Sequence, residues 1–158
     1  MKFKLFTICF LFAVFATAQN LNVTFRSQLN YGSGISCSNI CGYVDTTGRE
    51  YALVGTSQGM SVVDISDPDK PVEVKQITGP GSRWREIKVK GNYAYVTTEG
   101  GGGLQIVNLG SLPTATGITS KFWKDIFTGS LSSIHALHID GNYAYLYGSN
   151  LYQGPLLQ

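Results

Sequence analysis

Three adjacent residues, Trp84-Arg85-Glu86, combine side chains that bind ligands in many proteins. A guanidinium pairs with a carboxylate or phosphate through two parallel hydrogen bonds, and an indole offers a flat apolar face to a sugar or another ring. His135 and His138 follow at the start of a later, similar segment. These five residues are candidate ligand contacts. The alternative is structural: Trp84 packs between sheets while Arg85 pairs with Glu86.

The two histidines are three positions apart, a spacing that on a strand turns them to opposite faces, so they are not expected to share a metal ion. Cys37 and Cys41 are a second candidate pair. If their segment turns, two Cys four positions apart reach the Cα separation of about 5–6 Å that a disulfide needs. Free thiols are the alternative. A structural zinc needs four ligands, so neither a metal nor a cofactor is predicted.

The N-terminal residues 1–18 resemble a signal peptide. Lys2 and Lys4 are followed by the apolar run Leu5–Phe15 and by the small-residue cleavage motif Ala16-Thr17-Ala18. The run is shorter than the roughly 20 residues that span a bilayer. Without the two lysines the chain has ten basic and ten acidic residues, so no basic surface for nucleic acid is expected. We therefore predict export with cleavage.

One hairpin pattern recurs along the chain. A strand, a glycine-containing turn, a second strand and a proline stop occupy 50–71 and again 92–113, and the pattern restarts at 142. The five residues Gly-Asn-Tyr-Ala-Tyr are identical at 91–95 and 141–145. Repeats of about 40–50 residues with three or four short strands are typical of β-propeller blades. The sequence thus predicts an all-β protein.

We expect a partial β-propeller of about two and a half to three antiparallel four-stranded blades over 42–158, with blades near 42–84, 85–135 and 136–158. In a propeller, the five candidate ligand contacts lie where residues line the central channel or its mouth. Residues 19–41 are predicted to hold an N-terminal strand, Leu21–Gln28, and a loop that contains both cysteines.

The segment Ser120–Ser133 fits either a helical turn or the edge of a strand. The three aspartates Asp64, Asp67 and Asp69 are expected to cap turns rather than to bind calcium, because the spacing of an EF-hand loop is absent.

The chain resembles the LVIVD-repeat propellers, and more closely the family called choice-of-anchor B. The resemblance covers residues 42–158, and its motifs are Gly42-Tyr43-Val44-Asp45, Gly48-Arg49-Glu50-Tyr51-Ala52-Leu53-Val54-Gly55, Val63-Asp64-Ile65-Ser66-Asp67-Pro68, Trp84-Arg85-Glu86-Ile87-Lys88 and Gly103-Leu104-Gln105-Ile106-Val107. It implies an exported bacterial propeller held by one of several alternative C-terminal anchors. The family's Trp-Arg-Asp triplet is Trp84-Arg85-Glu86 here, and its His-Asn pair is His135-Ala136.

Two functions follow as expectations. The first is a non-enzymatic binding module, secreted or at the bacterial cell surface, with a protein or glycan partner. The second is an extracellular hydrolase or lyase that uses a carboxylate such as Asp45, Glu86 or Asp140 as general acid or base. The chain stops within its third hairpin, so we expect a fragment of a longer propeller. Its open sheet edges favour self-association.

Overall fold

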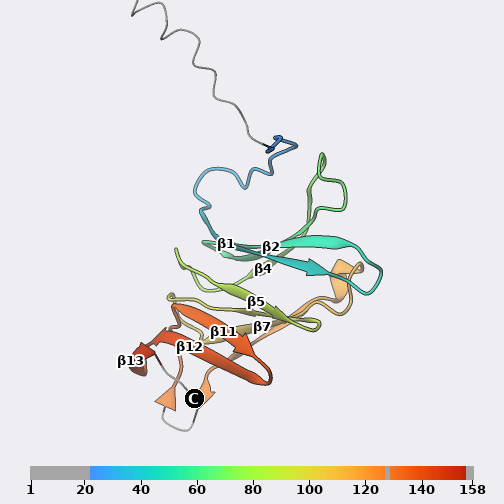
Figure 1. The fold of residues 1–158 in the computed structure, drawn as a ribbon. Coiled ribbons are helices and arrows are strands. Elements are labelled where there is room, and N and C mark those ends of the chain that lie inside the picture. The colour runs from blue at the N-terminus through green and yellow to red at the C-terminus, as the bar shows by residue number, and fades with distance from the viewer. Residues whose placement is uncertain (1–21, 127–128, 156–158) are drawn as a thin grey trace, which may run out of the picture.

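The computed structural model describes residues 22–126 and 129–155. It confirms the all-β class. Three antiparallel sheets follow one another along the chain and lie one above another (Figure 1). The first sheet consists of β1 (Cys37–Val44), β2 (Glu50–Thr56), β3 (Gly59–Asp64) and β4 (Val72–Thr78). The second consists of β5 (Ile87–Lys90), β6 (Tyr93–Val96), β7 (Leu104–Asn108) and β8 (Thr119–Trp123). The third consists of β11 (Ala136–Asp140), β12 (Tyr143–Ser149) and β13 (Tyr152–Pro155).

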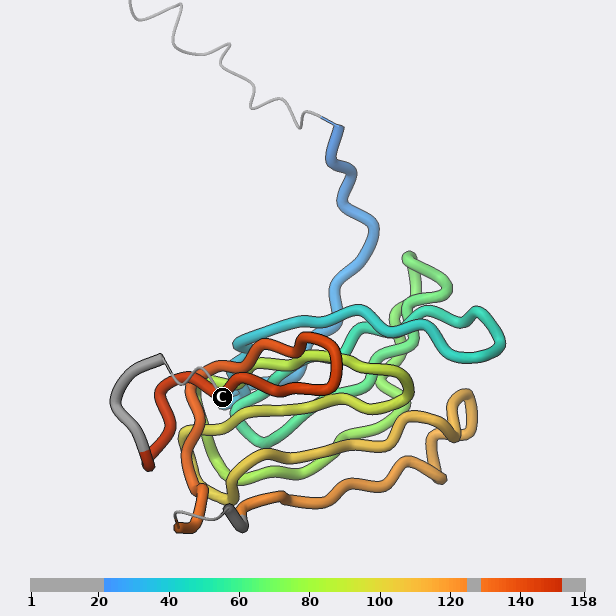
Figure 2. Tube along the Cα trace, turned by 60° about the horizontal axis from the view of Figure 1, so that its bottom comes forward, coloured from blue at the N-terminus to red at the C-terminus, as the bar shows by residue number. Residues whose placement is uncertain are grey.

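Each sheet pairs its strands in chain order, which is the strand order of a propeller blade. The first strands of the three sheets are neighbours, with β5 between β1 and β11 (Figure 1). Figure 2 turns the molecule so that the third sheet comes forward. A short 3-10 helix, Ala115–Gly117, precedes β8. No helix within the described ranges is both long and apolar enough to span a membrane.

Alternating apolar side chains join the sheets face to face. Tyr51 and Leu53 on β2, and Met60 and Val62 on β3, are fully or almost fully buried and pack against the second sheet. A smaller cluster around Leu104, together with Leu131, Ile134 and Leu137, joins the second sheet to the third. Residues two apart on a strand face the same side, so these four side chains cover one face of the first sheet. The hydrophobic pattern therefore sets the order in which the sheets stack.

A polar contact that crosses from sheet to sheet recurs at equivalent positions. The Asn39 side chain accepts a hydrogen bond from the main-chain N–H of Ile87 at 3.2 Å. One repeat later, Glu86 Oε2 accepts from the main-chain N–H of Leu137 at 2.9 Å. The strand registers align Asn39 with Glu86, and Ile87 with Leu137. Each repeat thus satisfies a main-chain donor in the first strand of the next.

A second recurring contact lies four residues further along the same strands. The Tyr43 hydroxyl donates to Asn92 Oδ1 at 3.3 Å. Lys90 Nζ donates to Asn142 Oδ1 at 2.9 Å and also to the Gly141 carbonyl. Tyr43 pairs with Tyr51 as Lys90 pairs with Tyr93, so Tyr43 and Lys90 occupy equivalent positions in their hairpins. The contact between the first and second sheets and the contact between the second and third sheets therefore use equivalent positions but different side chains.

The N-terminal strand prediction is wrong over the part of Leu21–Gln28 that the structure describes. Residues 22–28 form no strand, because no neighbouring strand pairs with them there. The segment instead lies against the first sheet through Arg26, which pairs with Asp69 at 2.6 Å, and through Ser27, whose hydroxyl donates to the Pro68 carbonyl at 2.6 Å. Leu21 and the signal peptide prediction lie outside the described residues.

The predicted cysteine loop is also corrected. Cys37 and Cys41 both lie on β1, which starts five residues before the position expected for the first blade, and both thiols are free. A strand advances about 3.3 Å per residue, so four positions separate the Cα atoms by roughly 13 Å, even if a bulge shortens this slightly. A disulfide needs less than about 7 Å. The predicted bridge within the chain is incompatible with this geometry.

In the undecided segment Ser120–Ser133, the described residues, all but 127–128, contain strands and no helix. Its first part belongs to β8, which pairs with β7. The rest contains β9 (Asp125–Ile126) paired with β10 (Gly129–Ser130). The aspartates cap turns, as expected: Asp64 accepts from the Ser66 N–H, and Asp67 accepts from the Asp69 N–H.

Asp45 organises the turn between β1 and β2. It accepts hydrogen bonds from the N–H and hydroxyl of Thr47, from the Arg49 N–H and from the Tyr51 hydroxyl, at 2.6–3.1 Å. Burial alone raises the pKa of the Asp45 carboxyl, but these hydrogen bonds outweigh burial and hold the pKa below its ordinary value. Burial and the bond to Asp45 raise the pKa of Tyr51 to about 12.

This depressed pKa predicts acid sensitivity. A carboxyl whose pKa is lower in the folded protein stabilises the fold above its unfolded pKa of about 3.9 and loses that contribution as pH falls. Between pH of about 5 and 2, the free energy of unfolding should fall more steeply for the wild type than for Asp45→Asn, as measured by urea unfolding at each pH. Asp140→Asn, at an exposed turn, is the control. Equal slopes for wild type and Asp45→Asn would contradict the prediction.

The contact of Glu86 with the third sheet predicts that two substitutions at this position differ in how much they lower the free energy of unfolding. Glu86→Ala leaves the Leu137 N–H without its acceptor, and an unsatisfied buried donor costs about 1–3 kcal/mol of unfolding free energy. Glu86→Gln retains an acceptor oxygen and should lose much less. Urea unfolding of both variants checks this. Equal losses would mean that the charge of Glu86, rather than its hydrogen bond, is what stabilises the fold.

Candidate functional site

The structure separates the triplet Trp84-Arg85-Glu86 into one exposed and two structural residues. Arg85 is only 4% exposed. Its Nε donates to the Thr56 carbonyl at 2.7 Å and its Nη2 donates to the Pro80 carbonyl. Both acceptors belong to the first repeat, whereas Arg85 begins the second. Arg85 is therefore a clamp between repeats and offers no exposed guanidinium to a ligand.

Glycines make room for this clamp. A Cβ atom at Gly55 would lie 3.2 Å from Arg85 Cβ, and one at Gly79 would lie 3.3 Å from Arg85 Nη1. The same Gly79 position faces Gln105 Oε1 at 3.2 Å. Arg85 Nη1 and Gln105 Oε1 are buried and lack a hydrogen-bond partner within the described part of the chain. Burial lowers the pKa of the Arg85 guanidinium, which is hydrogen-bonded to carbonyls.

Glu86 is occupied by contacts that hold the fold. One carboxylate oxygen pairs with Lys88 at 2.7 Å, and the other accepts the Leu137 N–H described above. The expected alternative, an Arg85–Glu86 ion pair, is thus replaced by two separate sets of partners. Asp45 is similarly surrounded by hydrogen bonds in its turn. Neither carboxylate is free for acid–base chemistry.

The exposed residues gather where hydrogen bonds tie neighbouring loops together. The Trp84 side chain is 57% exposed. The Ser82 hydroxyl donates to the Trp84 carbonyl at 2.8 Å and accepts from the N–H groups of Trp84 and Glu99, each at 3.3 Å. Glu99 Oε1 in turn lies 2.5 Å from His135 Nδ1. We call Ser82, Trp84, Glu99 and His135 the loop-end patch.

The loop-end patch has the chemistry of a polar ligand site. An exposed indole supplies a flat apolar face, while a carboxylate and an imidazole supply acceptor and donor groups. The Glu99–His135 contact joins the second repeat to the start of the third, so the patch spans two repeats. Serine hydrogen bonds fix the loop that carries Trp84. The patch is therefore partly pre-organised, which reduces the entropy cost of binding.

His138 does not belong to this patch. It lies on β11, three residues after His135, and its ring faces Tyr145 on β12 at a centroid distance of 6.4 Å. The two histidines thus have different surroundings, because His135 precedes β11 whereas His138 lies on it. Asp140, the remaining predicted acid–base candidate, is exposed at the turn between β11 and β12.

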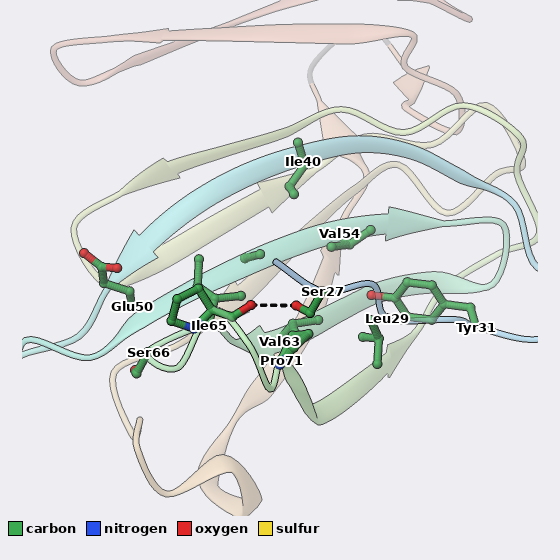
Figure 3. Close-up of a pocket in the computed structure, with 12 residues that line it drawn as sticks. Ser27, Leu29, Tyr31, Ile40, Glu50, Val54, Val63, Ile65, Ser66 and Pro71 are labelled. Atoms are coloured by element: carbon green, nitrogen blue, oxygen red, sulfur yellow. Dashed lines mark hydrogen bonds between the residues drawn. The ribbon is translucent and has the colours of Figure 1, made fainter. Parts of the chain in front are cut away.

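A groove of about 490 Å³ lies at another place, on the outer face of the first sheet (Figure 3). The N-terminal segment forms one wall through Ser27, Leu29 and Tyr31. The sheet forms the floor with mostly apolar side chains, among them Ala52, Val54 and Val63. The groove contains none of the five predicted ligand contacts.

Sequence reasoning missed Ser82 and Glu99 as members of the patch. Glu99 precedes four consecutive glycines, a composition typical of a flexible turn. A signal was nevertheless present, since Glu99 follows the end of β6 by three residues, just as His135 directly precedes β11. The contact between them crosses 36 positions of sequence.

Comparison with protein-family models finds two LVIVD repeats, at residues 49–78 and 82–118. The first match runs from β2 to the end of β4, and the second includes β5, β6 and β7. The chain therefore carries LVIVD repeats, and this part of the resemblance is confirmed. Searches of curated proteins and of solved structures gave no significant match. Membership of the choice-of-anchor B family stays a prediction.

The buried Arg85 predicts a stability effect. Arg85→Lys keeps the positive charge but loses the planar fork that reaches two carbonyls, so the free energy of unfolding should fall by about 2 kcal/mol. Arg83→Ala, an exposed neighbour on the same loop, is the control and should change stability by less than about 0.5 kcal/mol. Chemical unfolding measures both. Similar small effects for the two variants would contradict the role of Arg85 as a clamp.

Proposed function

We propose that this chain is an exported binding module of the bacterial cell surface, built from LVIVD repeats, and that the loop-end patch contacts its ligand. One observation carries the proposal: the loop of the exposed Trp84 is linked through the Ser82 hydroxyl to the main chain of Glu99, whose carboxylate pairs with His135. Large aromatic side chains with nearby polar groups are the usual anchors of binding surfaces. The N-terminal leader pattern supports export.

A glycan is the ligand class that best matches these groups. Sugar rings have apolar faces that stack on an indole, and their hydroxyl groups pair with carboxylate and imidazole groups at the rim. Of the carboxylates suggested for a hydrolase or lyase, Asp45 and Glu86 are engaged in contacts that hold the fold. We therefore propose binding without turnover.

The test uses the two tryptophans as a matched pair. Trp84 lies in the loop-end patch, whereas Trp123 on β8 is 43% exposed on another strand. Binding of peptidoglycan fragments and soluble surface polysaccharides is measured by calorimetry, with product analysis for cleavage. Trp84→Ala should weaken binding at least tenfold, because truncating an anchor residue costs more than about 1.4 kcal/mol. Trp123→Ala should bind as the wild type does.

Several outcomes would contradict this proposal. Equal affinity of Trp84→Ala and the wild type would exclude the patch as the binding surface. Loss of binding in Trp123→Ala alone would move the site to the outer strand. Cleavage of a polysaccharide that stops in Glu99→Gln, with folding unchanged, would favour the enzyme.

A further inference from the structure

The recurring contacts between sheets define two complementary surfaces. A repeat presents its successor with a hydrogen-bond acceptor and, four residues later, a hydroxyl or ammonium donor. These are Asn39 and Tyr43 in the first repeat, and Glu86 and Lys90 in the second. The successor receives them with a main-chain N–H and, just before the second strand of its hairpin, a side-chain oxygen.

The first sheet has its own receiving surface on the face away from the second sheet. Ile40 pairs with Val54, as Ile87 pairs with Val96, so the N–H equivalent to that of Ile87 is the N–H of Ile40. Glu50 precedes Tyr51 as Asn92 precedes Tyr93, so Glu50 takes the place of the accepting asparagine. Ile40 is 68% exposed, and both Ile40 and Glu50 line the groove in Figure 3.

The third sheet lacks the groups that this surface requires. By the same register its presenting positions are Ala136 and Asp140. Ala136 has no side-chain acceptor for the Ile40 N–H. Asp140 would face Glu50, and two carboxylates at one contact repel each other. The third sheet of one copy is therefore a poor partner for the first sheet of another.

From this mismatch we propose that the outer face of the first sheet, around Ile40 and Glu50, binds an LVIVD-type repeat that is not the third repeat of a second copy. This partner repeat presents a carboxylate or carboxamide to the Ile40 N–H and a basic or phenolic side chain to Glu50. Glu50 sets the charge preference, since a basic group pairs with it whereas an acidic group does not.

The N-terminal segment covers part of this face. Ala52 and Val63 on the floor of the groove are buried, whereas Ile40 and Glu50 are exposed. Its polar anchors, Arg26 with Asp69 and Ser27 with the Pro68 carbonyl, lie at the edge beyond β3 and are solvent-exposed. Exposed ion pairs contribute little to stability. Val23 and Phe25 in the same segment stay largely exposed instead of packing onto the sheet. An incoming repeat that covers the whole face therefore has to displace this segment, and the exposed anchors oppose that only weakly.

The test converts the third repeat into a matching partner. The double variant Ala136→Glu/Asp140→Lys gives the third repeat the same pair as the second repeat, Glu86 and Lys90. Sedimentation velocity over a range of concentrations should show association at least tenfold stronger than in the wild type. Adding Glu50→Lys to the double variant restores like-charge repulsion, now between lysines, and should return association to the wild-type level.

Single variants and folding controls make the result decisive. Asp140→Lys alone changes only an exposed turn residue and should give intermediate association, and circular dichroism verifies that each variant is folded. The proposal is overturned if the double variant associates no more than the wild type, or if Glu50→Lys leaves its association unchanged. Wild-type association that Glu50→Lys reduces would equally overturn it, since the third sheet would then already fit. None of these outcomes depends on Trp84, so the proposed glycan binding is tested separately.

Discussion

The fold depends on how each repeat satisfies a main-chain donor of the next. The first strand of a sheet has N–H groups that its own sheet does not pair, and burying such a donor without an acceptor is costly. Asn39 and Glu86 supply the acceptors for Ile87 and Leu137. Apolar packing brings the sheets together, but this bond fixes their register along the strands. Separating two repeats would expose the apolar faces and the donor at once.

The same constraint determines which predicted residues are available for binding. The position before Ile87 must accept a hydrogen bond, and Arg85 next to it must fill the space between Gly55 and Gly79. Two of the three residues in the Trp84-Arg85-Glu86 triplet are thereby committed to the fold. Only Trp84 is left exposed, where the Ser82 hydroxyl links its loop to that of Glu99. Within this triplet, a role in binding is therefore confined to Trp84.

The sequence was sufficient for the hairpins and insufficient for the environment of single side chains. Identical Gly-Asn-Tyr-Ala-Tyr segments predicted two hairpins correctly, because turn chemistry is local. Alternating residues around Val23 predicted a strand that does not form, since a strand also needs a neighbour. Cys37 looked like part of a loop because pairing with β2 is not local. Arg85 binds main-chain carbonyls, which every residue has, so no residue type signals its burial.

The two contacts between neighbouring sheets use different residue pairs, and this has an evolutionary consequence. Tyr43 with Asn92 is a neutral contact, whereas the Lys90 contact carries a charge. A newly duplicated repeat must match one neighbour on each of its faces, and drift at a presenting position is tolerated only if the receiving position of the next repeat changes with it. The matched residue pairs at these contacts therefore determine which repeats can follow one another in the chain. Shuffling two repeats would break both contacts even if every hairpin kept its own fold.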